Sequence, residues 1–447
     1  MELESHKLST GFLEIREYFR NFTLKLLSWI VLLNFCFMIL FYDISIYLYY
    51  FSLLLAFPFN SKARAWIRGR KKWAEKLQED IDSRSPIIWF HVSSLGEYEQ
   101  GRPIIESWKE ENPEYKILLT FFSPSGYENV IDHKDVDFVH YAPLDTRRNA
   151  RKFMSIVKPK YVVFVKYEFW YHLLHEAKRF SACIILVSGI FRSGQLFFKF
   201  YGRWYRKILY FFDQIFVQDE NSIDLLMQLG GLNVSLAGDT RFDRVAQIAL
   251  QPKQIDTVKN FTEGRFTCIF GNTWKKDEDI IIPYINSCKS DSCFVIAPHE
   301  IGPAHIEQLM NRLHKRVALY SLAYGKSLTE ARVLIIDNIG MLSSIYHYGN
   351  VAYIGGGFGK GIHNILEPAV YGMPVVFGPR YFKFREAVEL VKEGGAFSVT
   401  SFEELKTVFD MLKEEKVRLG KASEATRQFI QRNLGATRAI LNYLKKS

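Results

Sequence analysis

The chain has 447 residues, of which 48% are hydrophobic and 24% are charged. This length exceeds what one hydrophobic core usually accommodates, which excludes a single small domain and predicts two large ones. The composition is that of a globular protein, and the formal net charge of +10 predicts an anionic partner, either nucleic acid or a membrane surface.

The N-terminal region is apolar and leads into a basic cluster. Residues 26–42 contain no charged side chain, and after Asp43 residues 44–59 contain none either. Each run is near the lower length limit for a membrane-spanning helix, and positive charge on the next flank favours a cytoplasmic location for the rest of the chain. We interpret residues 1–60 as a membrane anchor region, with one span and an interfacial segment or a tight helical hairpin, rather than buried core helices. The basic cluster is Lys62, Arg64, Arg68, Arg70, Lys71 and Lys72.

Strand-like and helix-like segments alternate along the rest of the chain. This alternation predicts α/β architecture with parallel sheets, in two Rossmann-like halves. The polar segment 251–264 is the expected boundary, which gives an N-terminal domain at 61–250 and a C-terminal domain at 251–447 with closing helices over 401–446. The strand-like runs are Ile87–Val92, Lys116–Thr120, Tyr161–Val165, Ile184–Val187, Gln214–Val217, Val234–Ala237, Thr267–Phe270, Cys293–Ala297, Val333–Ile336, Val351–Ile354, Val375–Phe377 and Ala396–Val399.

One segment of the first half is dense in aromatic residues. Leu196–Phe212 reads LFFKFYGRWYRKILYFF, with four cations interleaved. A basic aromatic helix suits a membrane interface or an anionic lipid headgroup, and it could also stack nucleic-acid bases. We favour the membrane interface over a buried core helix because of the cations and the apolar N-terminus.

Charged residues stand at three strand ends of the first half, where the ligands of parallel sheets bind. Glu97 follows the first strand in HVSSLGE and could accept a proton from a hydroxyl group, but Ser94 three residues earlier fits a capping box equally well. Glu168 lies at the strand-to-helix junction after the run Tyr161–Val165 and is a second candidate site residue. The alternative is that it is simply a solvated residue at the start of a helix. Arg241, in GDTRFD, could hold a phosphate oxygen or pair with a neighbouring aspartate.

The stretch VAYIGGGFGKGIHNILEPAVYGMPVVFGP, residues 351–379, predicts a strand, a glycine turn, a helix and a strand. A helix starting near His363 would leave backbone N–H groups free to bind a phosphate, with Asn364 and Glu367 in its first turn. The glycines Gly355, Gly356 and Gly357 form the expected phosphate loop, although a tight turn between packed elements is the alternative. The stretch contains no GxGxxG, and no acid follows its second strand, so an NAD enzyme is disfavoured.

Two further observations concern metals and bases. His299 follows a strand in the second half and could hold a phosphate or base, although a lone histidine is more often structural. The five cysteines include no CxxC pair, which predicts reduced thiols, no disulfide framework and no zinc site.

Taken together, these motifs resemble the 3-deoxy-D-manno-octulosonic acid (Kdo) transferases of lipopolysaccharide core assembly. The resemblance runs from about Tyr42 to the C-terminus, with the motifs in the family's order. The matching stretches are HVSSLGEYEQGRPII, LLTFFSPSGYE, YAPLDTRRNARKF, KYEFWYHLL, FVQDENS, GDTRFD, GNTW, APHE, YIGGGFGKGIHNILEPAVYGMPVVFGP and KFREA.

The resemblance implies a GT-B glycosyltransferase, with two Rossmann-like domains facing across a cleft and an N-terminal membrane anchor in the inner membrane. It implies inverting transfer of Kdo from CMP-Kdo to a lipid A precursor (lipid IVA) on the cytoplasmic side, without a metal, a cofactor or nucleic acid. Glu97 matches the general base, and Glu168 and Arg241 match the residues that stabilise the transition state. The N-terminal domain would hold the acceptor. The segments matching the CMP contacts contain Pro298, His299, Ile339, Gly340, Met341, Asn364, Ile365, Leu366 and Glu367.

The chain departs from the family pattern around the fourth strand. Lys166 and Tyr167 replace an acid and a threonine, and Tyr171 and His172 replace a proline and an asparagine, which leaves the details of acceptor binding open. Alternative functions are a GT-B transferase that uses a UDP-sugar, a membrane-bound binding protein with a degenerate cleft, and an RNA-binding protein. The sequence leaves open the number of Kdo residues added, the acyl pattern of the acceptor, the oligomeric state and whether residues 1–37 form an extra span.

Overall fold

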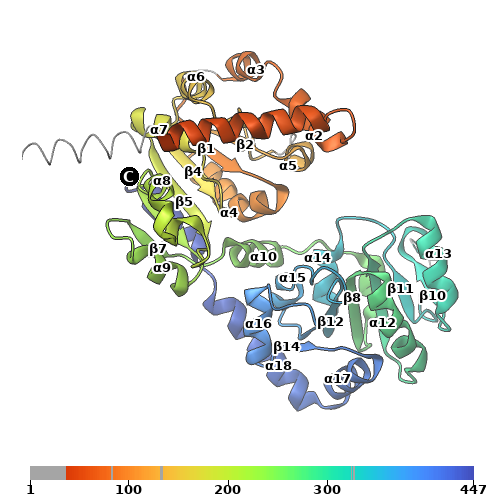
Figure 1. Cartoon of the computed structure of the whole chain (residues 1–447). Coiled ribbons are helices and arrows are strands. Elements are labelled where there is room, and N and C mark those ends of the chain that lie inside the picture. The colour runs from red at the N-terminus through yellow and green to blue at the C-terminus, as the bar shows by residue number, and fades with distance from the viewer. Residues whose placement is uncertain (1–36, 82–83, 131–133, 324, 326–327) are drawn as a thin grey trace, which may run out of the picture. The chain divides into compact units, whose positions relative to one another are not determined.

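The computed structural model describes residues 37–447 apart from 82–83, 131–133, 324 and 326–327. The chain divides into two compact units (Figure 1). Unit 1 runs to Gly238 and also contains Arg438–Ser447, and unit 2 is Asp239–Thr437. The predicted boundary at 250 and 251 therefore differs from the observed division, because the helix before it packs in unit 2 and the last ten residues return to unit 1.

Unit 1 is built on a seven-stranded parallel sheet with the strand order β3-β2-β1-β4-β5-β6-β7. The order reverses between β1 and β4, so this pair forms the topological switch point of the sheet. The strands are β1 Ile87–Val92, β2 Lys116–Phe121, β3 Phe138–Tyr141, β4 Tyr161–Val165, β5 Cys183–Gly189, β6 Gln214–Val217 and β7 Val234–Leu236.

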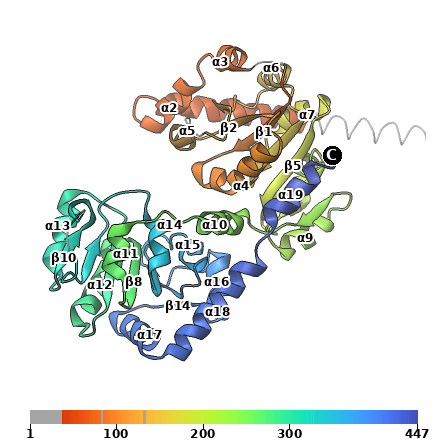
Figure 2. The ribbon, with the colours of Figure 1, turned by 180° about the vertical axis from the view of Figure 1, so that it is seen from behind.

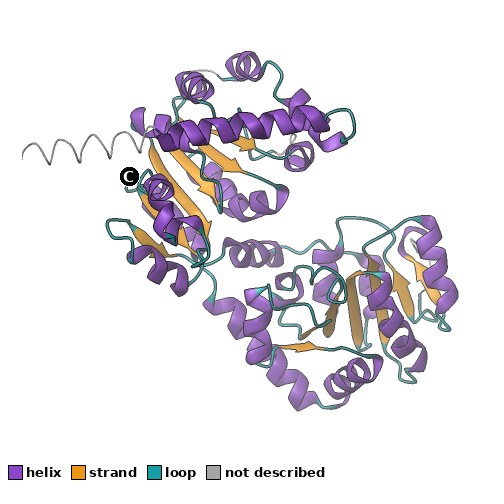
Figure 3. Cartoon of the chain, viewed as in Figure 1, coloured by secondary structure: helices purple, strands orange, loops and turns teal. Residues whose placement is uncertain are grey.

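Helices cover both faces of this sheet (Figure 3). Alternate residues of β1 point to opposite faces, with Trp89 in one buried cluster and Phe90 in the other. The C-terminal helix α19 belongs to the second cluster, which contains its Ile440 and Leu444 (Figure 2). The helices are α2 Ser61–Gly69, α3 Trp73–Asp80, α4 Leu95–Glu111, α5 Pro124–Val130, α6 Arg147–Val157, α7 Tyr171–Arg179, α8 Arg203–Leu209, α9 Glu220–Met227 and α19 Ala436–Leu444.

Unit 2 has a second seven-stranded parallel sheet, with the order β10-β11-β9-β8-β12-β13-β14. Its order reverses between β8 and β12, which places the switch point next to the glycine cluster. The strands are β8 Thr267–Thr273, β9 Cys293–Pro298, β10 Val317–Leu319, β11 Val333–Ile335, β12 Val351–Ile354, β13 Val375–Phe377 and β14 Ala396–Ser398.

Helices also cover both faces of the unit 2 sheet (Figure 3). One buried cluster contains Phe242 of α10 and Phe429 of α18, and the other contains Ile281 of α12 and Phe409 of α17. The helices are α10 Thr240–Leu250, α11 Asp256–Thr262, α12 Lys275–Ser287, α13 Pro303–Arg312, α14 Leu342–Ile345, α15 Leu366–Ala369, α16 Arg385–Lys392, α17 Phe402–Glu414 and α18 Lys416–Arg432.

The helix Phe37–Ala56 is long and apolar enough to cross a membrane by length and composition, with a mean hydropathy of 1.6. It runs through Asp43, although the sequence predicts two separate apolar runs on either side of this residue. The run over 26–42 lies mostly outside the described residues. One side of the helix contacts unit 1, because the Tyr42 hydroxyl donates to Asp145 Oδ2 at 2.5 Å and Asp43 Oδ1 lies 2.6 Å from His172 Nε2. The other side leaves large apolar side chains exposed.

The expected aromatic helix over 196–212 is wrong in its length and its placement. The segment folds as two 3₁₀ turns, Leu196–Phe198 and Phe200–Gly202, followed by α8. Phe197 and Trp204 are buried in the core of unit 1, and Arg206 donates to the backbone carbonyls of Phe197 and Lys199 instead of facing lipid. Only part of the segment, including Phe200 and Tyr201, is exposed.

Candidate functional site

The two switch points place chemically active side chains at the carboxyl ends of the central strands in each unit. In unit 1 Glu97 lies in the first turn of α4, directly after β1, and Glu168 lies in the loop after β4. In unit 2 the loops after β8 and β12 carry Trp274 and the glycine cluster. These are the positions at which open α/β sheets bind ligands, so each unit has a candidate site of its own.

Glu97 serves as a helix cap in this structure, as one of the two sequence interpretations expected. It forms a capping box with Ser94, and its Oε2 accepts the backbone N–H groups of Ser93 at 2.5 Å and Ser94 at 3.2 Å. Burial raises the pKa of Glu97, and the negative charge of Glu168 raises it further, against the opposing effect of those N–H groups and Lys166. A carboxylate with a raised pKa is a better proton acceptor, so capping and base catalysis are compatible here.

Glu168 is not the solvated helix start that the sequence left open, because it is buried. Its Oε2 lies 3.2 Å from His91 Nε2 and accepts the indole N–H of Trp170 at 2.5 Å. Burial acts to raise the pKa of Glu168, but the hydrogen bonds from His91 and Trp170 outweigh it, and the pKa is lowered. Two neighbouring carboxyl groups whose pKa values shift in opposite directions are typical of an acid–base site.

The backbone beside these carboxylates is strained. Lys166, the first residue after β4, has φ 62°, and Ser188 near the end of β5 has φ 57°. Left-handed backbone in a residue other than glycine costs on the order of 1 kcal/mol and persists only where surrounding contacts enforce it. Strain of this kind gathers at functional sites, and here it lies at the carboxyl edge of the unit 1 sheet.

In unit 2 the glycine cluster is tied to the rest of the sheet by Asp277, which the sequence analysis missed. This carboxylate is fully buried and accepts three hydrogen bonds, from Gly356 N at 2.9 Å, the Tyr353 hydroxyl at 2.8 Å and Trp274 N at 2.9 Å. It thereby links the first turn of α12 to the loop after β12. An acid three residues after the N-cap residue Trp274, at position N3 of α12, was the available sequence signal.

The expectation of free N–H groups at the glycine cluster is wrong for most of its glycines. Gly355 N donates to Gly271 O, Gly356 N to Asp277, and Gly359 N and Gly361 N to Gly356 O. The glycines at 355 and 357 are needed for packing, since a Cβ at these positions would lie 2.1 Å from Asn272 O and 2.6 Å from the Gly378 backbone. The tight-turn interpretation therefore explains most of this cluster.

The helix expected near His363 begins at Leu366 and is only four residues long. Its start is organised by Asn364, whose Oδ1 accepts Leu366 N at 3.1 Å and whose Nδ2 donates to Glu367 Oε1 at 3.2 Å. Such a short helix has a weak dipole, so its N-terminus supplies less electrostatic attraction than expected.

Three rings from three different loops meet at the carboxyl edge of the unit 2 sheet. The Trp274 and His299 ring centroids lie 4.1 Å apart, and those of His299 and His363 lie 5.0 Å apart. Trp274 Nε1 donates to His363 Nε2 at 3.0 Å. Burial and the neighbouring His299 lower the pKa of His363. The structure thus brings predicted His299 together with Trp274 and His363, neither of which was predicted as a site residue.

The other predicted CMP contacts lie on the same edge of the sheet. Pro298 ends β9, and Ile339, Gly340 and Met341 follow β11. Gly340 has φ 88° and Ile339 is 85% exposed, so this loop presents an apolar side chain to solvent from a left-handed turn. Ile365 and Leu366, in contrast, are buried in the core and can contribute only backbone atoms to a ligand.

Arg241 is paired with carboxylates, as the alternative interpretation expected in part. Its Nη2 lies 2.6 Å from Asp239 Oδ2, and its Nη1 lies 3.1 Å from Glu386 Oε1. Burial acts to lower the pKa of Arg241, but the two carboxylates raise it overall. The guanidinium is therefore held in place and always charged, although part of its charge is already compensated.

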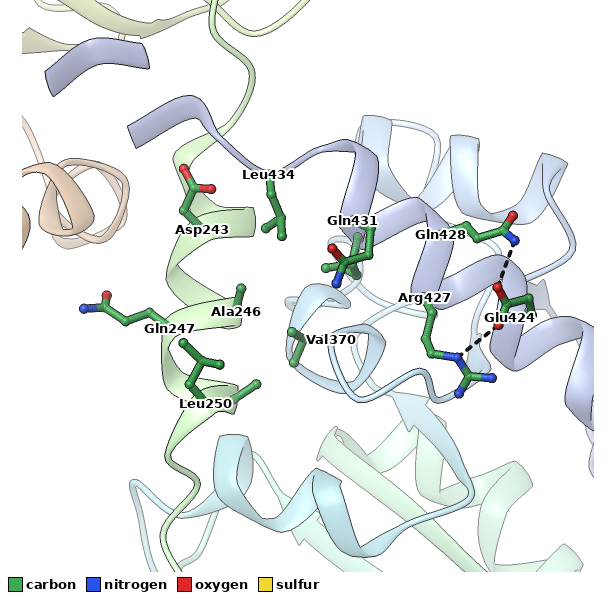
Figure 4. Close-up of a pocket in the computed structure, with 12 residues that line it drawn as sticks. Asp243, Ala246, Gln247, Leu250, Val370, Glu424, Arg427, Gln428, Gln431 and Leu434 are labelled. Atoms are coloured by element: carbon green, nitrogen blue, oxygen red, sulfur yellow. Dashed lines mark hydrogen bonds and ion pairs between the residues drawn. The ribbon is translucent and has the colours of Figure 1, made fainter. Parts of the chain in front are cut away.

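The described residues contain a pocket of about 720 Å³ that lies away from these strand ends. It is formed by α10, α18 and the residues around Val370, and Arg427 and Gln428 on its wall both bond to Glu424 (Figure 4). No group of three or more histidine, cysteine, aspartate or glutamate residues that could hold a metal ion occurs among the described residues.

Comparisons with known proteins connect this geometry to one family. A model of the family described as 3-Deoxy-D-manno-octulosonic-acid transferase matches residues 68–244. A transferase of this name from Aquifex aeolicus is 28% identical over 357 residues, which cover 78% of this chain and 92% of that protein. One from Chlamydia trachomatis is 26% identical and covers 76% of this chain and 80% of that protein.

This chain is a relative of the Kdo transferases. Because the matches extend over most of the chain and of these relatives, they identify it as a transferase enzyme. Three of the residues that carry the sequence resemblance lie within the span of the family match, namely Glu97, Glu168 and Arg241.

Solved structures confirm the fold class of this Kdo transferase relative. A UDP-GlcNAc 2-epimerase from Neisseria meningitidis has a TM-score of 0.58 at 16% identity and covers 81% of this chain and 100% of that protein. A glycosyltransferase from Rickettsia africae has a TM-score of 0.53 at 13% identity, with coverages of 81% and 98%. The fold is thus of the GT-B type, with two Rossmann-like units, as predicted.

Proposed function

We propose that this enzyme transfers Kdo from CMP-Kdo to a lipid A precursor, lipid IVA, with inversion at the anomeric carbon. The observation that carries the proposal is the carboxylate pair at the switch point of unit 1, in which Glu97 has a raised pKa and Glu168 a lowered one. The relatives supply the identity of the sugar, since both are Kdo transferases by name, and the family model matches residues 68–244, which contain both carboxylates.

In the proposed reaction Glu97 removes the proton from the acceptor hydroxyl. The hydroxyl oxygen then forms a bond to the anomeric carbon of Kdo on the side opposite to the phosphate. The bond from that carbon to the phosphate oxygen breaks, and CMP leaves with the electron pair. Charge develops on the leaving phosphate, so fixed positive charge and N–H dipoles lower the barrier. We assign Arg241 to stabilisation of this negative charge and the ionised Glu168 to stabilisation of the positive charge that develops at the oxocarbenium-like anomeric carbon.

We assign acceptor binding to unit 1 and CMP binding to the carboxyl edge of unit 2. The support for the second assignment is the convergence there of the predicted segments around His299, Met341 and Asn364. A single phosphate leaving group does not require a divalent cation, so we expect transfer to persist in EDTA. The domain roles and metal independence rest on the resemblance and this chemistry.

We also propose that the enzyme works at the cytoplasmic face of the inner membrane. The helix Phe37–Ala56 supports this, because its unpaired side exposes a row of large apolar side chains and α2 adds basic residues next to it. The exposed large apolar residues of the helix are Phe37, Leu40, Phe41, Ile44, Tyr47, Leu48, Tyr49, Phe51, Leu54 and Leu55.

The test is to incubate the purified full chain with CMP-Kdo, made in situ, and tetraacyl lipid A precursor, followed by mass spectrometry. Each transferred Kdo adds one discrete mass step, which also counts the sugars added. Calorimetry with CMP and UDP separates this function from that of a UDP-sugar transferase. Absence of any mass step, with intact CMP binding, would leave the binding-protein alternative in its place.

A further inference from the structure

Behind Glu168 lies a buried chain of polar side chains to which no role has been given. Trp89 Nε1 donates to Thr120 Oγ1 at 2.8 Å, and Thr120 Oγ1 lies 2.8 Å from His91 Nδ1. His91 Nε2 in turn lies 3.2 Å from Glu168 Oε2. Trp89, His91 and Thr120 have no exposed surface, so no water competes for these contacts.

The protons in this chain can be assigned by counting donors. The indole N–H of Trp89 can only donate, so it occupies one lone pair of Thr120 Oγ1. The hydroxyl proton of Thr120 then has two choices, His91 Nδ1 at 2.8 Å or the Phe90 carbonyl at 3.4 Å, and the shorter contact is favoured. With Nδ1 accepting, the ring proton is on Nε2 and points to Glu168.

The opposite tautomer fits poorly. A proton on His91 Nδ1 would leave the lone pair of Nε2 facing the carboxylate of Glu168 at 3.2 Å, inside the protein, where such repulsion is poorly screened. The indole Nε1 of Trp170 lies 3.1 Å from His91 Nε2 but 2.5 Å from Glu168 Oε2, so its N–H serves the carboxylate first and offsets little of that repulsion. The Thr120 hydroxyl would also be left with the 3.4 Å contact alone. The hydrogen bonds are therefore all donated in the same direction, from Trp89 to Thr120, from Thr120 to His91 and from His91 to Glu168.

We propose that His91 is a positioning residue that keeps Glu168 ionised, and that Trp89 and Thr120 fix the His91 tautomer that does so. This deepens the proposed function, on which the link to catalysis rests. A buried carboxylate without such donors would take up a proton, because desolvation disfavours its charged form. The indole of Trp170 supplies a second donor to the same oxygen.

Several titratable groups lie near Glu168 among the described residues. Glu97 on α4 and Tyr49 on the helix Phe37–Ala56 face it electrostatically, and Lys166 and Tyr167 interact with Glu97. Glu97 disfavours the charge on Glu168, so His91 and Trp170 act against a neighbouring carboxylate as well as against burial. Removal of the His91 donor is expected to raise the pKa of Glu168 by about one unit, the usual size for a hydrogen bond to a charged group.

The experiment uses the full chain labelled with ¹⁵N in histidine and in the tryptophan indole, read by NMR as a function of pH. His91 is assigned from His91→Gln and Trp170 from Trp170→Phe. We expect His91 to carry its proton on Nε2. The Trp170 indole resonance reports the protonation of Glu168, and its titration midpoint is expected to move upward by about one pH unit in His91→Leu.

The variants of the chain separate positioning from packing. Thr120→Val keeps the shape of the side chain but removes the hydroxyl, so the titration midpoint should also rise. Thr120→Ser and His91→Gln retain a donor, so their midpoints should stay near that of the parent. Thr426→Val removes a comparably buried hydroxyl in unit 2, which bonds Ala422 O at 2.8 Å, and should lower stability without moving the midpoint. If His91→Leu does not fold, Thr120→Val still decides.

The link to catalysis is read from transfer rates in the same variants. The ratio of the Thr120→Val rate to the parent rate should fall by about tenfold from the neutral plateau to the acid end of the profile, following the protonation of Glu168. A proton on Nδ1 of His91, or midpoints that do not move, would overturn the proposal, as would a rate loss independent of pH. If the parent shows no transfer, the proposed function fails, and the two NMR readouts alone decide on His91.

Discussion

Glu97 combines a structural contact with the chemical role that we propose for it, and one substitution separates them. Glutamine suits the capping box as well as glutamate does, but it cannot accept a proton. Glu97→Gln should therefore keep the thermal stability of the parent while the transfer rate falls by about 10²- to 10⁴-fold. Rates and unfolding curves measured together check this. Glu97→Ala should lose both thermal stability and transfer activity. A Glu97→Gln enzyme that transfers at the parent's rate would leave Glu97 with its capping role alone.

The pH dependence of transfer follows from the shifted pKa of Glu97. The base must be ionised, so the rate should fall as the pH drops through the pKa of Glu97, which lies above the ordinary glutamate value of about 4.3. In Glu168→Gln a neighbouring negative charge is lost. The residual activity of this variant should therefore show its acid limb at lower pH than the parent. A pH profile of kcat/KM for both proteins is the measurement, and an acid limb at higher pH in the variant would contradict it.

The same shifts affect stability in opposite directions. Because Glu97 binds its proton more tightly in the folded state, its contribution favours folding at low pH and declines as the pH rises through its folded pKa. Glu168, with its lowered pKa, contributes stability above the ordinary glutamate value that is lost as the pH falls through its folded pKa.

Burial and hydrogen bonds of this kind are invisible in a linear motif. The sequence placed Glu97 and Glu168 at the right strand ends, but it could not show their mutual influence or His91 behind them.

At the scale of elements, the helix Phe37–Ala56 is fixed to unit 1 through a buried carboxylate. Asp145 accepts the Tyr42 hydroxyl and the N–H groups of His172 and Leu173. Tyr42→Phe removes one hydrogen bond to a charged group, so it should lower the free energy of unfolding by about 1.5–3 kcal/mol. Tyr47→Phe, on the exposed side of the same helix, is the control and should change little. Denaturant unfolding measures both, and equal effects would argue against this attachment.

The exposed side of that helix is where we expect contact with lipid. Leu48 and Leu55 are each 62% exposed, and glutamate at either position would place a charge against the membrane. Leu48→Glu should reduce binding to vesicles that contain anionic lipid by several-fold or more, whereas Leu250→Glu, at an exposed leucine of unit 2, should not. Vesicle sedimentation compares the two. Equal binding by all variants would remove this helix from the membrane interface.

The strands were predictable because buried parallel strands read as short, continuous apolar runs. The runs Ile87–Val92 and Tyr161–Val165 coincide with β1 and β4. The three-residue edge strand β10 was missed because it is only half-buried and lacks that signal. The segment 196–212 failed as a single helix for a different reason, since some of its aromatic side chains, such as Phe197 and Trp204, pack in the core while others, such as Phe200 and Tyr201, stay exposed.

At the scale of the whole molecule, the two units should respond to different ligands. CMP should slow amide exchange in the loops after β8, β9 and β12 of unit 2, and the lipid acceptor should slow it in the loops after β1 and β4 of unit 1. Hydrogen exchange with mass spectrometry on the full chain checks this. Protection by CMP in unit 1 alone would reverse the assigned roles.

The sequence predicted two domains, but it could not show that the last ten residues return to the first, because α19 reads like any amphipathic helix that closes a domain.

That return has a consequence for biosynthesis. The side chains Ile440, Leu441 and Leu444 seal one face of the first sheet, yet they are synthesised only after the whole of unit 2. Each buried aliphatic group contributes about 1.5–3 kcal/mol, so the nascent N-terminal portion keeps an uncovered apolar face until α19 has been synthesised. A premature stop at Arg438 would spare every catalytic side chain named above and still yield a product prone to aggregation.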